Sequence, residues 1–152
     1  MRVAKDEAAA RIDRIAAECV AVRLRMINRV VTNIYDDALR PFGLKVSQMN
    51  ILVAAAKMGT VRPTDLGEVL HLDTSTLSRN LDRMKARGWL EVVSNDQDAR
   101  SQPIRLTRQG RTLLDRAAAA WEPVQEKVTR LLGEAVVDHL HEAAKRISIN
   151  AR

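Results

Sequence analysis

The sequence predicts a mainly α-helical fold that carries one small β-hairpin. Apolar residues recur every three or four positions through most of the 152-residue chain, which places them on one face of each helix. Aromatic residues make up 3% of the chain, whereas Ala, Leu, Val and Arg are frequent. The apolar period shortens only between residues 89 and 106, where two short β-compatible runs flank a polar loop. A chain of this length is expected to form one domain, with at most an extension through which two chains associate.

The first helix is predicted to be long and to cover residues 7–40. Pro41 and Gly43 end it. A single small domain cannot cover a helix of this length, so we expect its first half to pack on another chain. Its apolar stripe consists of Ile12, Ile15, Cys19, Val22, Met26, Val30, Ile34 and Ala38.

Two shorter helices are expected next, at residues 47–59 and 63–70. Ser47 is a favourable N-cap for the first of them, and Gly59 ends it. Pro63 suits the first position of the second helix, where the lack of a backbone N–H costs no hydrogen bond. The segment LHLD then allows only a tight connection to the following helix.

The fourth predicted helix, TSTLSRNLDRMKARG, has two chemically different faces. Asp73 or Thr74 caps its start, and Gly88 closes its end. Its exposed face carries Ser, Thr and Asn, which are mediocre helix formers, so the sequence indicates a role there beyond helix stability. The apolar face consists of Leu77, Leu81 and Met84.

A β-hairpin is predicted after this helix. Trp89–Val93 and Pro103–Leu106 supply its strands, and the loop SNDQDARSQ forms its tip. We expect Trp89 to anchor the hairpin on the preceding helix.

Two further helices complete the predicted fold. Thr107 caps the first of them, and Pro123 is expected to kink it. Gly133 separates it from the last helix, whose apolar positions run to Ile147. Trp121 is expected to pack between chains or between domains.

Two short helices joined by a tight turn and followed by a hairpin form a winged helix-turn-helix. In this arrangement the second helix enters the major groove of DNA, which is wide enough to admit it. Arg and Asn can contact base edges there, and Ser, Thr and backbone N–H groups can donate to phosphates. The net charge of +6 and the pI ≈ 10.1 agree with an anionic partner. Residues 74–111 alone hold eight basic and four acidic residues.

Three segments carry a resemblance to a known family: YDDALRPFGLKVSQMNIL, PTDLGEVLHLDTSTLSRNLDRMKARGWLE and NDQDARSQPIRLTRQG. Their order and spacing, and above all the D-x-R near the hairpin tip followed by LT, resemble MarR-family transcriptional regulators over nearly the whole chain. The resemblance implies a winged helix-turn-helix DNA-binding domain at residues 44–107 and a helical dimerisation platform formed by residues 1–40 and 108–152. It further implies a homodimer that binds double-stranded DNA at a pseudo-palindromic operator, with half-sites about one helical turn apart.

Roles in DNA binding follow for the fourth helix and for the hairpin loop. The exposed face of the helix supplies donors for bases and phosphates. By resemblance, Arg100 is the wing arginine that inserts into the minor groove, where narrow A·T tracts concentrate negative potential. Asp98 or Asp96 then pairs with Arg100 and orients it. The residues predicted to contact DNA are Thr74, Ser75, Thr76, Ser78, Arg79, Asn80, Arg83, Lys85, Asp98 and Arg100.

A small-molecule effector is also implied, because MarR-family regulators often bind aromatic or lipophilic anions between the dimerisation platform and the DNA-binding lobe. The function expected from the resemblance is therefore a homodimeric repressor that such a ligand releases, although activators occur in the family too. Any single arginine in this region is also consistent with a solvated face, and the apolar positions with plain core. The candidate ligand-binding residues are Arg23, Met26, Val30, Met49 and Leu52.

Two alternatives remain open. Some relatives sense oxidants through a cysteine of the first helix, and Cys19 is the only cysteine of this chain. It lies in the apolar stripe more than about four turns from the only tyrosine, Tyr35, which favours a small buried side chain over a redox sensor. A winged-helix adaptor that binds protein rather than DNA is the other alternative, and the Ser, Thr, Asn and Arg face argues against it.

No catalytic motif, cofactor or metal site is predicted. The sequence has no Gly-rich phosphate loop and no nucleophile elbow. His139 and His141 do not share a helical face, and His71 has no partner at ligand spacing. No stretch approaches about 18 apolar residues, and the charged N-terminus lacks a signal-peptide core, so a cytoplasmic protein without a membrane span is expected.

Overall fold

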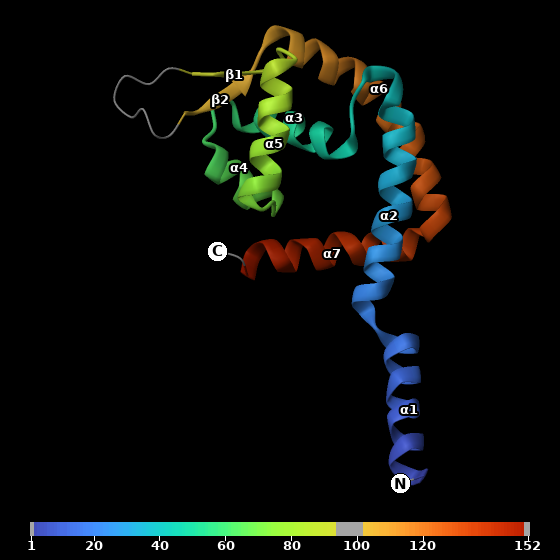
Figure 1. The fold of residues 1–152 in the computed structure, drawn as a ribbon. Coiled ribbons are helices and arrows are strands. Elements are labelled where there is room, and N and C mark those ends of the chain that lie inside the picture. The colour runs from blue at the N-terminus through green and yellow to red at the C-terminus, as the bar shows by residue number, and fades with distance from the viewer. Residues whose placement is uncertain (1, 94–101, 151–152) are drawn as a thin grey trace. The chain divides into compact units, whose positions relative to one another are not determined.

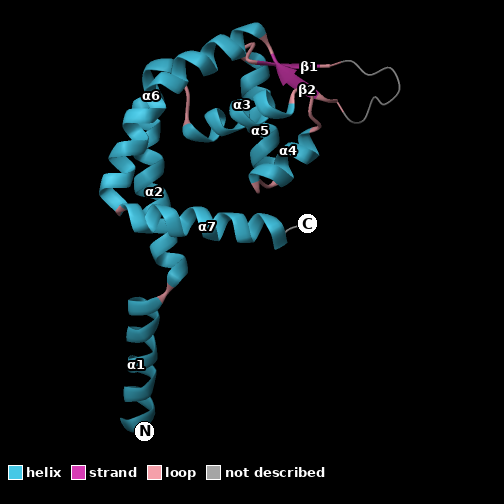
Figure 2. Ribbon diagram, turned by 180° about the vertical axis from the view of Figure 1, so that it is seen from behind, coloured by secondary structure: helices cyan, strands magenta, loops and turns pink. Residues whose placement is uncertain are grey.

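The computed structural model describes the backbone of residues 2–93 and 102–150, and the side chains of residues 7–93 and 102–148. The predicted wing residues Asp98 and Arg100 lie outside the described residues. The chain divides into two compact units, Met1–Asn33 and Ile34–Arg152. The elements in chain order are α1 (Arg2–Glu18), α2 (Val20–Leu39), the 3₁₀ helix η1 (Arg40–Phe42), α3 (Val46–Met58), α4 (Pro63–Leu70), α5 (Thr74–Ala86), β1 (Leu90–Val92), β2 (Ile104–Leu106), α6 (Arg108–Leu132) and α7 (Glu134–Asn150) (Figures 1 and 2).

The N-terminal unit contains α1 and most of α2, and Cys19 separates the two helices. The prediction of one continuous helix is therefore wrong, since the helical pattern is interrupted at Cys19 (Figure 1). The bond from the Arg23 backbone N–H to the Cys19 carbonyl oxygen is long, at 3.5 Å. The Arg23 guanidinium also donates to the carbonyl oxygens of Ala16 and Cys19, at 3.1 and 3.3 Å, and so satisfies acceptors at the interruption.

The C-terminal unit holds the hydrophobic core, which lies among α3, α4, α5, the hairpin and the first half of α6. Each of these helices buries the apolar face that its spacing of three and four residues predicts. A fully buried aliphatic side chain stabilises the fold by about 1.5–3 kcal/mol. The largest side chains with the least exposure are Leu39, Ile51, Leu52, Leu66, Met84 and Ile104.

The start of α3 differs from the prediction, because Ser47 is not its N-cap. Lys45 occupies that position, and its backbone N–H donates to Gln48 Oε1 at 3.1 Å. The Val46 N–H donates to Asp36 Oδ1 at 2.8 Å. Since Asp36 belongs to α2, this bond holds the end of α2 against the start of α3 and makes a serine cap unnecessary.

The predicted hairpin is confirmed, and the first residue of β2 is attached to the connection between α3 and α4. The strands pair antiparallel, with Leu90 opposite Leu106 and Val92 opposite Ile104. Val61, before α4, extends this pairing. Its N–H donates to the Ile104 carbonyl oxygen at 2.9 Å, and its own carbonyl oxygen accepts from the Ile104 N–H at 2.8 Å.

Trp89 anchors the hairpin on α5, as the sequence predicts, and also joins it to α6. Its side chain is buried, and its N–H donates to the Met84 carbonyl oxygen at 3.0 Å. Its own carbonyl oxygen accepts from the Thr107 N–H at 3.1 Å. The Arg87 guanidinium lies over the indole, 4.9 Å from the ring centroid. Thr107 caps α6, since its hydroxyl oxygen accepts from the Gly110 N–H at 3.0 Å.

α6 continues through Pro123, and Figure 1 shows that it changes direction along its length. The Tyr35 hydroxyl donates to Gln125 Oε1, which ties the end of α2 to α6. Partial burial raises the pKa of Tyr35. None of the helices within the described ranges is long and apolar enough to cross a membrane.

Gly110 is a position where an added methyl group should destabilise the fold. A Cβ there would lie 2.1 Å from the Trp89 carbonyl oxygen and 2.9 Å from Leu106 Cδ2. We expect Gly110→Ala to lower the free energy of unfolding by about 1–3 kcal/mol, because the clash with backbone forces the hairpin and α6 apart. Urea unfolding followed by circular dichroism measures this loss.

Gly67→Ala is the matched control, because Gly67 is also helical but its Cβ would meet a side-chain atom of Leu77 at 3.3 Å, and no backbone atom as close as the 2.1 Å at Gly110. Helix propensity favours Ala by up to about 1 kcal/mol, so this variant should lose much less stability. Equal losses in the two variants would contradict a special role for the close contact at Gly110.

Candidate nucleic-acid interface

A tight turn between α4 and α5 sets how these two helices meet. His71 ends α4 in the left-handed conformation, with φ 51°, which glycine more often adopts at the end of a helix. The N–H of Leu72 donates to the Gly67 carbonyl oxygen at 3.0 Å, and that of His71 donates to Glu68 at 3.2 Å. Gly67 allows α5 to approach closely, because a Cβ there would lie 3.3 Å from Leu77. The two helices and this turn form a helix-turn-helix.

α5 presents one face to the core and the other to solvent. Leu77 and Leu81 are each 4% exposed and Met84 is 0% exposed, so this face fixes the helix in place. The predicted DNA contacts of α5 all lie at positions with access to solvent. Exposed side chains are those of Thr74, Ser75, Ser78, Arg79 and Arg83, and partly buried ones are those of Thr76, Asn80 and Lys85.

Asp73 organises the N-terminus of α5. Its Oδ1 accepts from the Ser75 hydroxyl at 2.7 Å and from the Thr76 backbone N–H at 2.9 Å. These hydrogen bonds, that of the Ser75 hydroxyl first, hold the pKa of the Asp73 carboxyl well below its usual range. Asp73 is therefore an ionised N-cap at neutral pH, next to the positive end of the helix dipole.

Arg79 and Asn80 both bond to the turn of α5 that precedes them. Arg79 Nε donates to the Ser75 carbonyl oxygen at 3.1 Å, and Arg79 Nη2 donates to Ser75 Oγ at 3.2 Å. Asn80 Nδ2 donates to the Thr76 carbonyl oxygen at 3.0 Å. A guanidinium has five N–H donors, so Arg79 retains donors for a partner.

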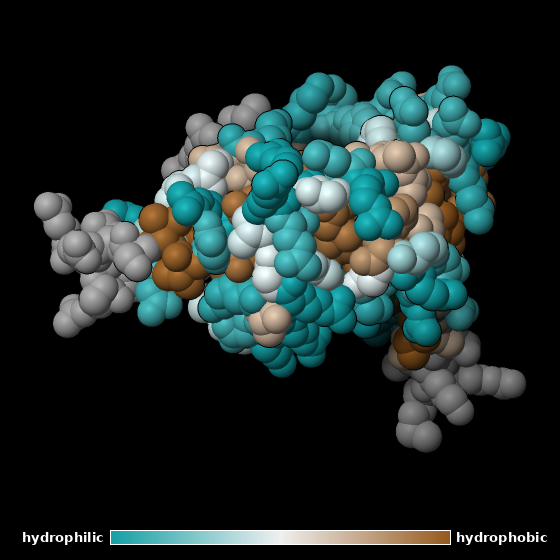
Figure 3. Space-filling view, turned by 90° about the horizontal axis from the view of Figure 1, so that it is seen from above, coloured by the Kyte–Doolittle hydropathy of each residue, from teal (hydrophilic) through white to brown (hydrophobic). Residues whose placement is uncertain are grey.

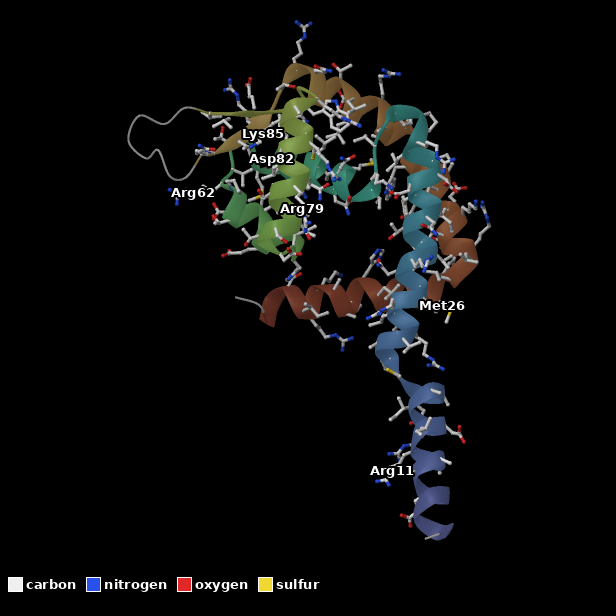
Figure 4. All side chains as sticks on the ribbon, viewed as in Figure 1. Arg11, Met26, Arg62, Arg79, Asp82 and Lys85 are labelled. Atoms are coloured by element: carbon white, nitrogen blue, oxygen red, sulfur yellow. The ribbon has the colours of Figure 1, made fainter. Side chains whose placement is uncertain are left out.

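Two ion pairs flank this face. Lys85 Nζ lies 2.9 Å from Asp82 Oδ1, and Figure 4 shows both side chains on α5. On the hairpin, Arg105 Nε lies 2.6 Å from Glu91 Oε1. Exposed pairs of this kind contribute only about 0–1 kcal/mol, so the basic partners can turn to a phosphate at little cost.

Arg62 is a basic residue that the sequence analysis missed. It occupies the N-cap position of α4, is exposed, and adds a positive charge to the helix-turn-helix (Figure 4). The sequence did contain a signal, since a basic residue stands directly before Pro63 at the start of the motif. Side chains at this place in a helix-turn-helix are suited to phosphates rather than to base edges.

A groove of about 560 Å³ lies on the same surface, between α4 and α5 and beside Gln102, which precedes β2. Leu72, Leu77 and Leu81 give it an apolar floor. Ser78 and Lys85, two of the predicted DNA contacts, stand in its wall. The groove therefore belongs to the candidate interface.

The predicted effector-binding residues have different environments. Met49 and Leu52 belong to the core of the C-terminal unit, with exposed fractions of 6% and 0%. Met26 and Val30 belong to the N-terminal unit and are 59% and 45% exposed. Arg23 belongs to the same unit and bonds carbonyl oxygens at the interruption between α1 and α2.

Cys19 is partly buried at that interruption and forms no disulfide. Among the described side chains, those of residues 7–93 and 102–148, no group of three from His, Cys, Asp or Glu is placed to hold a metal ion.

The helix-turn-helix and the hairpin that follows it define the class of the protein, a winged helix-turn-helix protein. A model of the MarR family matches residues 42–101. The multiple antibiotic resistance protein MarR of Salmonella typhimurium is 29% identical over 90 residues. That match covers 59% of this chain and 62% of the relative, less than two thirds of its length.

Two solved structures match over longer segments. A mutant MarR from E. coli complexed with operator DNA has a TM-score of 0.78 at 22% identity, over 88% of this chain and 96% of that one. The transcriptional regulator MOSR of M. tuberculosis in complex with DNA has a TM-score of 0.70 at 32% identity, over 86% of this chain and 98% of that one. The chain belongs to the MarR family.

Asp73 should make the stability of the folded protein depend on pH. Because its pKa is lower in the folded state than the value of about 3.9 in an unfolded chain, its contribution is fully present above that value. The contribution is lost as the pH falls toward the folded-state pKa. We expect Asp73→Asn to be less stable than the wild type at about pH 7, and the difference to shrink below about pH 4.

Thermal unfolding of the two proteins across this pH range gives that difference. Asp115→Asn, which removes an exposed carboxylate from α6, controls for the loss of one surface charge. A difference between Asp73→Asn and the wild type that stays constant at all pH values would show that the carboxylate is not the source of the stabilisation.

Proposed function

We propose that this protein is a sequence-specific, double-stranded DNA-binding transcriptional regulator that acts as a homodimer. The observation that carries the proposal is the exposed face of α5, where polar and basic side chains project from a helix whose other face is fixed in the core. A helix with this chemistry, second in a helix-turn-helix and followed by a hairpin, is suited to the major groove.

The relatives and the charge support this proposal. The structures of E. coli MarR with operator DNA and of MOSR with DNA are each matched by this chain over almost their whole length. The net charge of +6 favours a polyanion as partner. We therefore propose a regulator rather than an enzyme, and a cytoplasmic location in which it has access to DNA.

In the proposed complex, the two ends of α5 have different tasks. Near its N-terminus, Thr74 and backbone N–H groups donate to phosphates, which the helix dipole attracts. Arg79 and Arg83, further along the exposed face, reach base edges. Arg62 and Lys85 anchor phosphates from either side. Arg100, oriented by Asp98, remains a proposed minor-groove contact.

The homodimer is proposed because large apolar side chains remain exposed in the single chain. Ile12 and Met26 of the N-terminal unit are 65% and 59% exposed, and Ile147 near the end of α7 is 60% exposed. Figure 3 shows patches of hydrophobic residues among hydrophilic ones on the face that it displays. Covering such patches stabilises an assembly by roughly 25 cal/mol for each Å² of apolar surface removed from water.

A second copy of the chain is the partner that this fold family suggests for these surfaces. We propose that residues 1–40 and 108–152 form the dimerisation region, and that residues 44–107 form the DNA-binding domain.

We propose that a small ligand, such as an aromatic or lipophilic anion, releases a repressor from its operator. The ligand needs only a few kcal/mol of differential affinity between the binding and non-binding arrangements to empty the operator. Arg23, Met26 and Val30 are candidates for contact with it. Met49 and Leu52 meet a ligand only if the packing of α3 opens, because both are buried.

Cys19 carries the alternative mode of regulation, since it stands where the first two helices separate. Oxidation there would act on the N-terminal unit. DNA binding that peroxide abolishes in the wild type and spares in Cys19→Ser would favour this redox mechanism over a small ligand.

The proposed function is tested by selecting binding sites from a randomised duplex library with the purified protein at moderate salt. We expect enrichment of a pseudo-palindrome with half-sites about one helical turn apart, because two copies of α5 must reach successive major grooves. Affinity for that site should fall steeply as salt rises. A folded dimer that enriches no sequence and ignores salt would favour the protein-binding adaptor instead.

Arg79 and Arg111 should differ in what their loss does to DNA binding. Arg79 projects from α5, whereas Arg111 is exposed in the first turn of α6. We expect Arg79→Ala to relax sequence preference, at a cost of about 1–3 kcal/mol on the operator, and Arg111→Ala to weaken all sequences alike. Titrations against the operator and a random duplex measure both. Equal losses of Arg79→Ala on the two duplexes would remove Arg79 from base recognition.

A further inference from the structure

The guanidinium of Arg79 is held in one place before any partner is present. Two of its donors are engaged with Ser75, Nε with the carbonyl oxygen at 3.1 Å and Nη2 with the hydroxyl oxygen at 3.2 Å. Long exposed arginines ordinarily sample many rotamers, and each must be frozen when a partner binds. Here the residue one turn earlier on the same helix restricts that freedom.

Asp73 determines which way the Ser75 hydroxyl points. A hydroxyl group has a single proton, and that of Ser75 is donated to Asp73 Oδ1 at 2.7 Å. Its lone pairs therefore remain for Arg79 Nη2. The same Oδ1 also accepts from the Thr76 backbone N–H at 2.9 Å, which holds the Asp73 carboxylate in this position. The result is a directed chain of hydrogen bonds from Arg79 through Ser75 to Asp73.

We propose that Ser75 is a positioning residue that presents Arg79 to a guanine in the major groove; this inference rests on the proposed DNA-binding function. With Nε and one N–H of Nη2 turned toward Ser75, the outer edge of the guanidinium carries an N–H of Nη1 and the second N–H of Nη2. Within the part of the chain that the structure describes, Nη1 makes no hydrogen bond.

The outer edge of the guanidinium matches guanine among the four bases. Its two parallel donors fit two acceptors side by side, which the major-groove edge of guanine offers as O6 and N7. Adenine offers N7 beside a donor, and thymine offers O4 beside a methyl group. Phosphates also accept two donors, but they do so from any orientation and give no base preference.

Ser47, which is not among the proposed DNA contacts, provides a control for Ser75. Both serines are exposed on helices, but within the described residues only Ser75 bonds Arg79 and Asp73. Ser75→Thr keeps a hydroxyl at the same place and serves as the conservative variant. All variants are first compared with the wild type in thermal unfolding, so that a loss of folding is recognised as such.

The experiment measures the affinities of the wild type, Ser75→Ala, Ser75→Thr and Ser47→Ala at a single salt concentration. The duplexes are the operator obtained by selection, its three variants at each base pair of a half-site, and a random duplex. The same series in the Arg79→Ala background completes a double-mutant cycle.

We expect Ser75→Ala to reduce the preference for guanine at one base pair roughly three- to tenfold, a part of the discrimination given by a bidentate contact. Binding to the random duplex should change less than about twofold, since phosphates are unaffected. Ser75→Thr should restore the preference, Ser47→Ala should keep it, and Ser75→Ala should have no effect once Arg79 is alanine.

Three results would overturn the inference while leaving the proposed function intact. The first is an operator at which no preference for guanine depends on Arg79. The others are a preference for guanine that Ser75→Ala fully retains, and an effect of Ser75→Ala that persists when Arg79 is alanine. A wild type that does not distinguish the operator from random DNA would overturn the proposed function itself, and the inference with it.

Discussion

The burial of Leu77, Leu81 and Met84 is the interaction on which the rest of the structure depends. These side chains fix the rotation of α5 about its axis, because any rotation exposes apolar surface at a cost of about 25 cal/mol for each Å². Once the rotation is fixed, the helical repeat of about 3.6 residues decides which residues face outward. The positions of Ser75 and Arg79 are thus determined by three residues that have almost no contact with solvent.

Polar contacts at the ends of elements complete the frame around α5. Arg87, directly after the helix, donates through Nη1 to the Gly43 carbonyl oxygen at 2.7 Å. The Thr107 hydroxyl donates to the Gly88 carbonyl oxygen at 2.6 Å, which joins the end of α5 to the start of α6. Asp36, near the end of α2, accepts from the Val46 backbone N–H at the start of α3. Each contact pairs a backbone group that a helix end would otherwise leave free, so α5 is held at its C-terminal end as well as along one face.

Apolar spacing predicted α3 to α7 and the hairpin, because the face that a helix or strand buries is a local property of its sequence. Apolar spacing failed at two places where a side chain satisfies backbone groups. Arg23 does so at the interruption at Cys19, and Asp36 does so at the start of α3, where Ser47 was the expected cap. In the candidate site, the outward face of α5 followed from the same spacing. The bonds between Arg79 and Ser75 did not, since they depend on the rotamer of an exposed side chain, which no periodicity encodes. Arg62 was missed for a simpler reason, since it precedes α4 and stands outside α5, whose composition indicated the role in DNA binding.

The composition of α5 shows how stability and recognition are combined in one short helix. Ser, Thr and Asn occupy five of its positions, and each is roughly 0.5 kcal/mol less favourable than Ala in a helix. Three buried side chains, each stabilising by about 1.5–3 kcal/mol, offset that cost from the opposite face. The residues of the exposed face, for which we propose DNA contacts, are therefore free to be chosen for contact rather than for propensity. The same division explains a carboxylate in a basic region, because the hydrogen bonds of Asp73 direct its charge to the start of the helix, where it orders Ser75 instead of repelling phosphate.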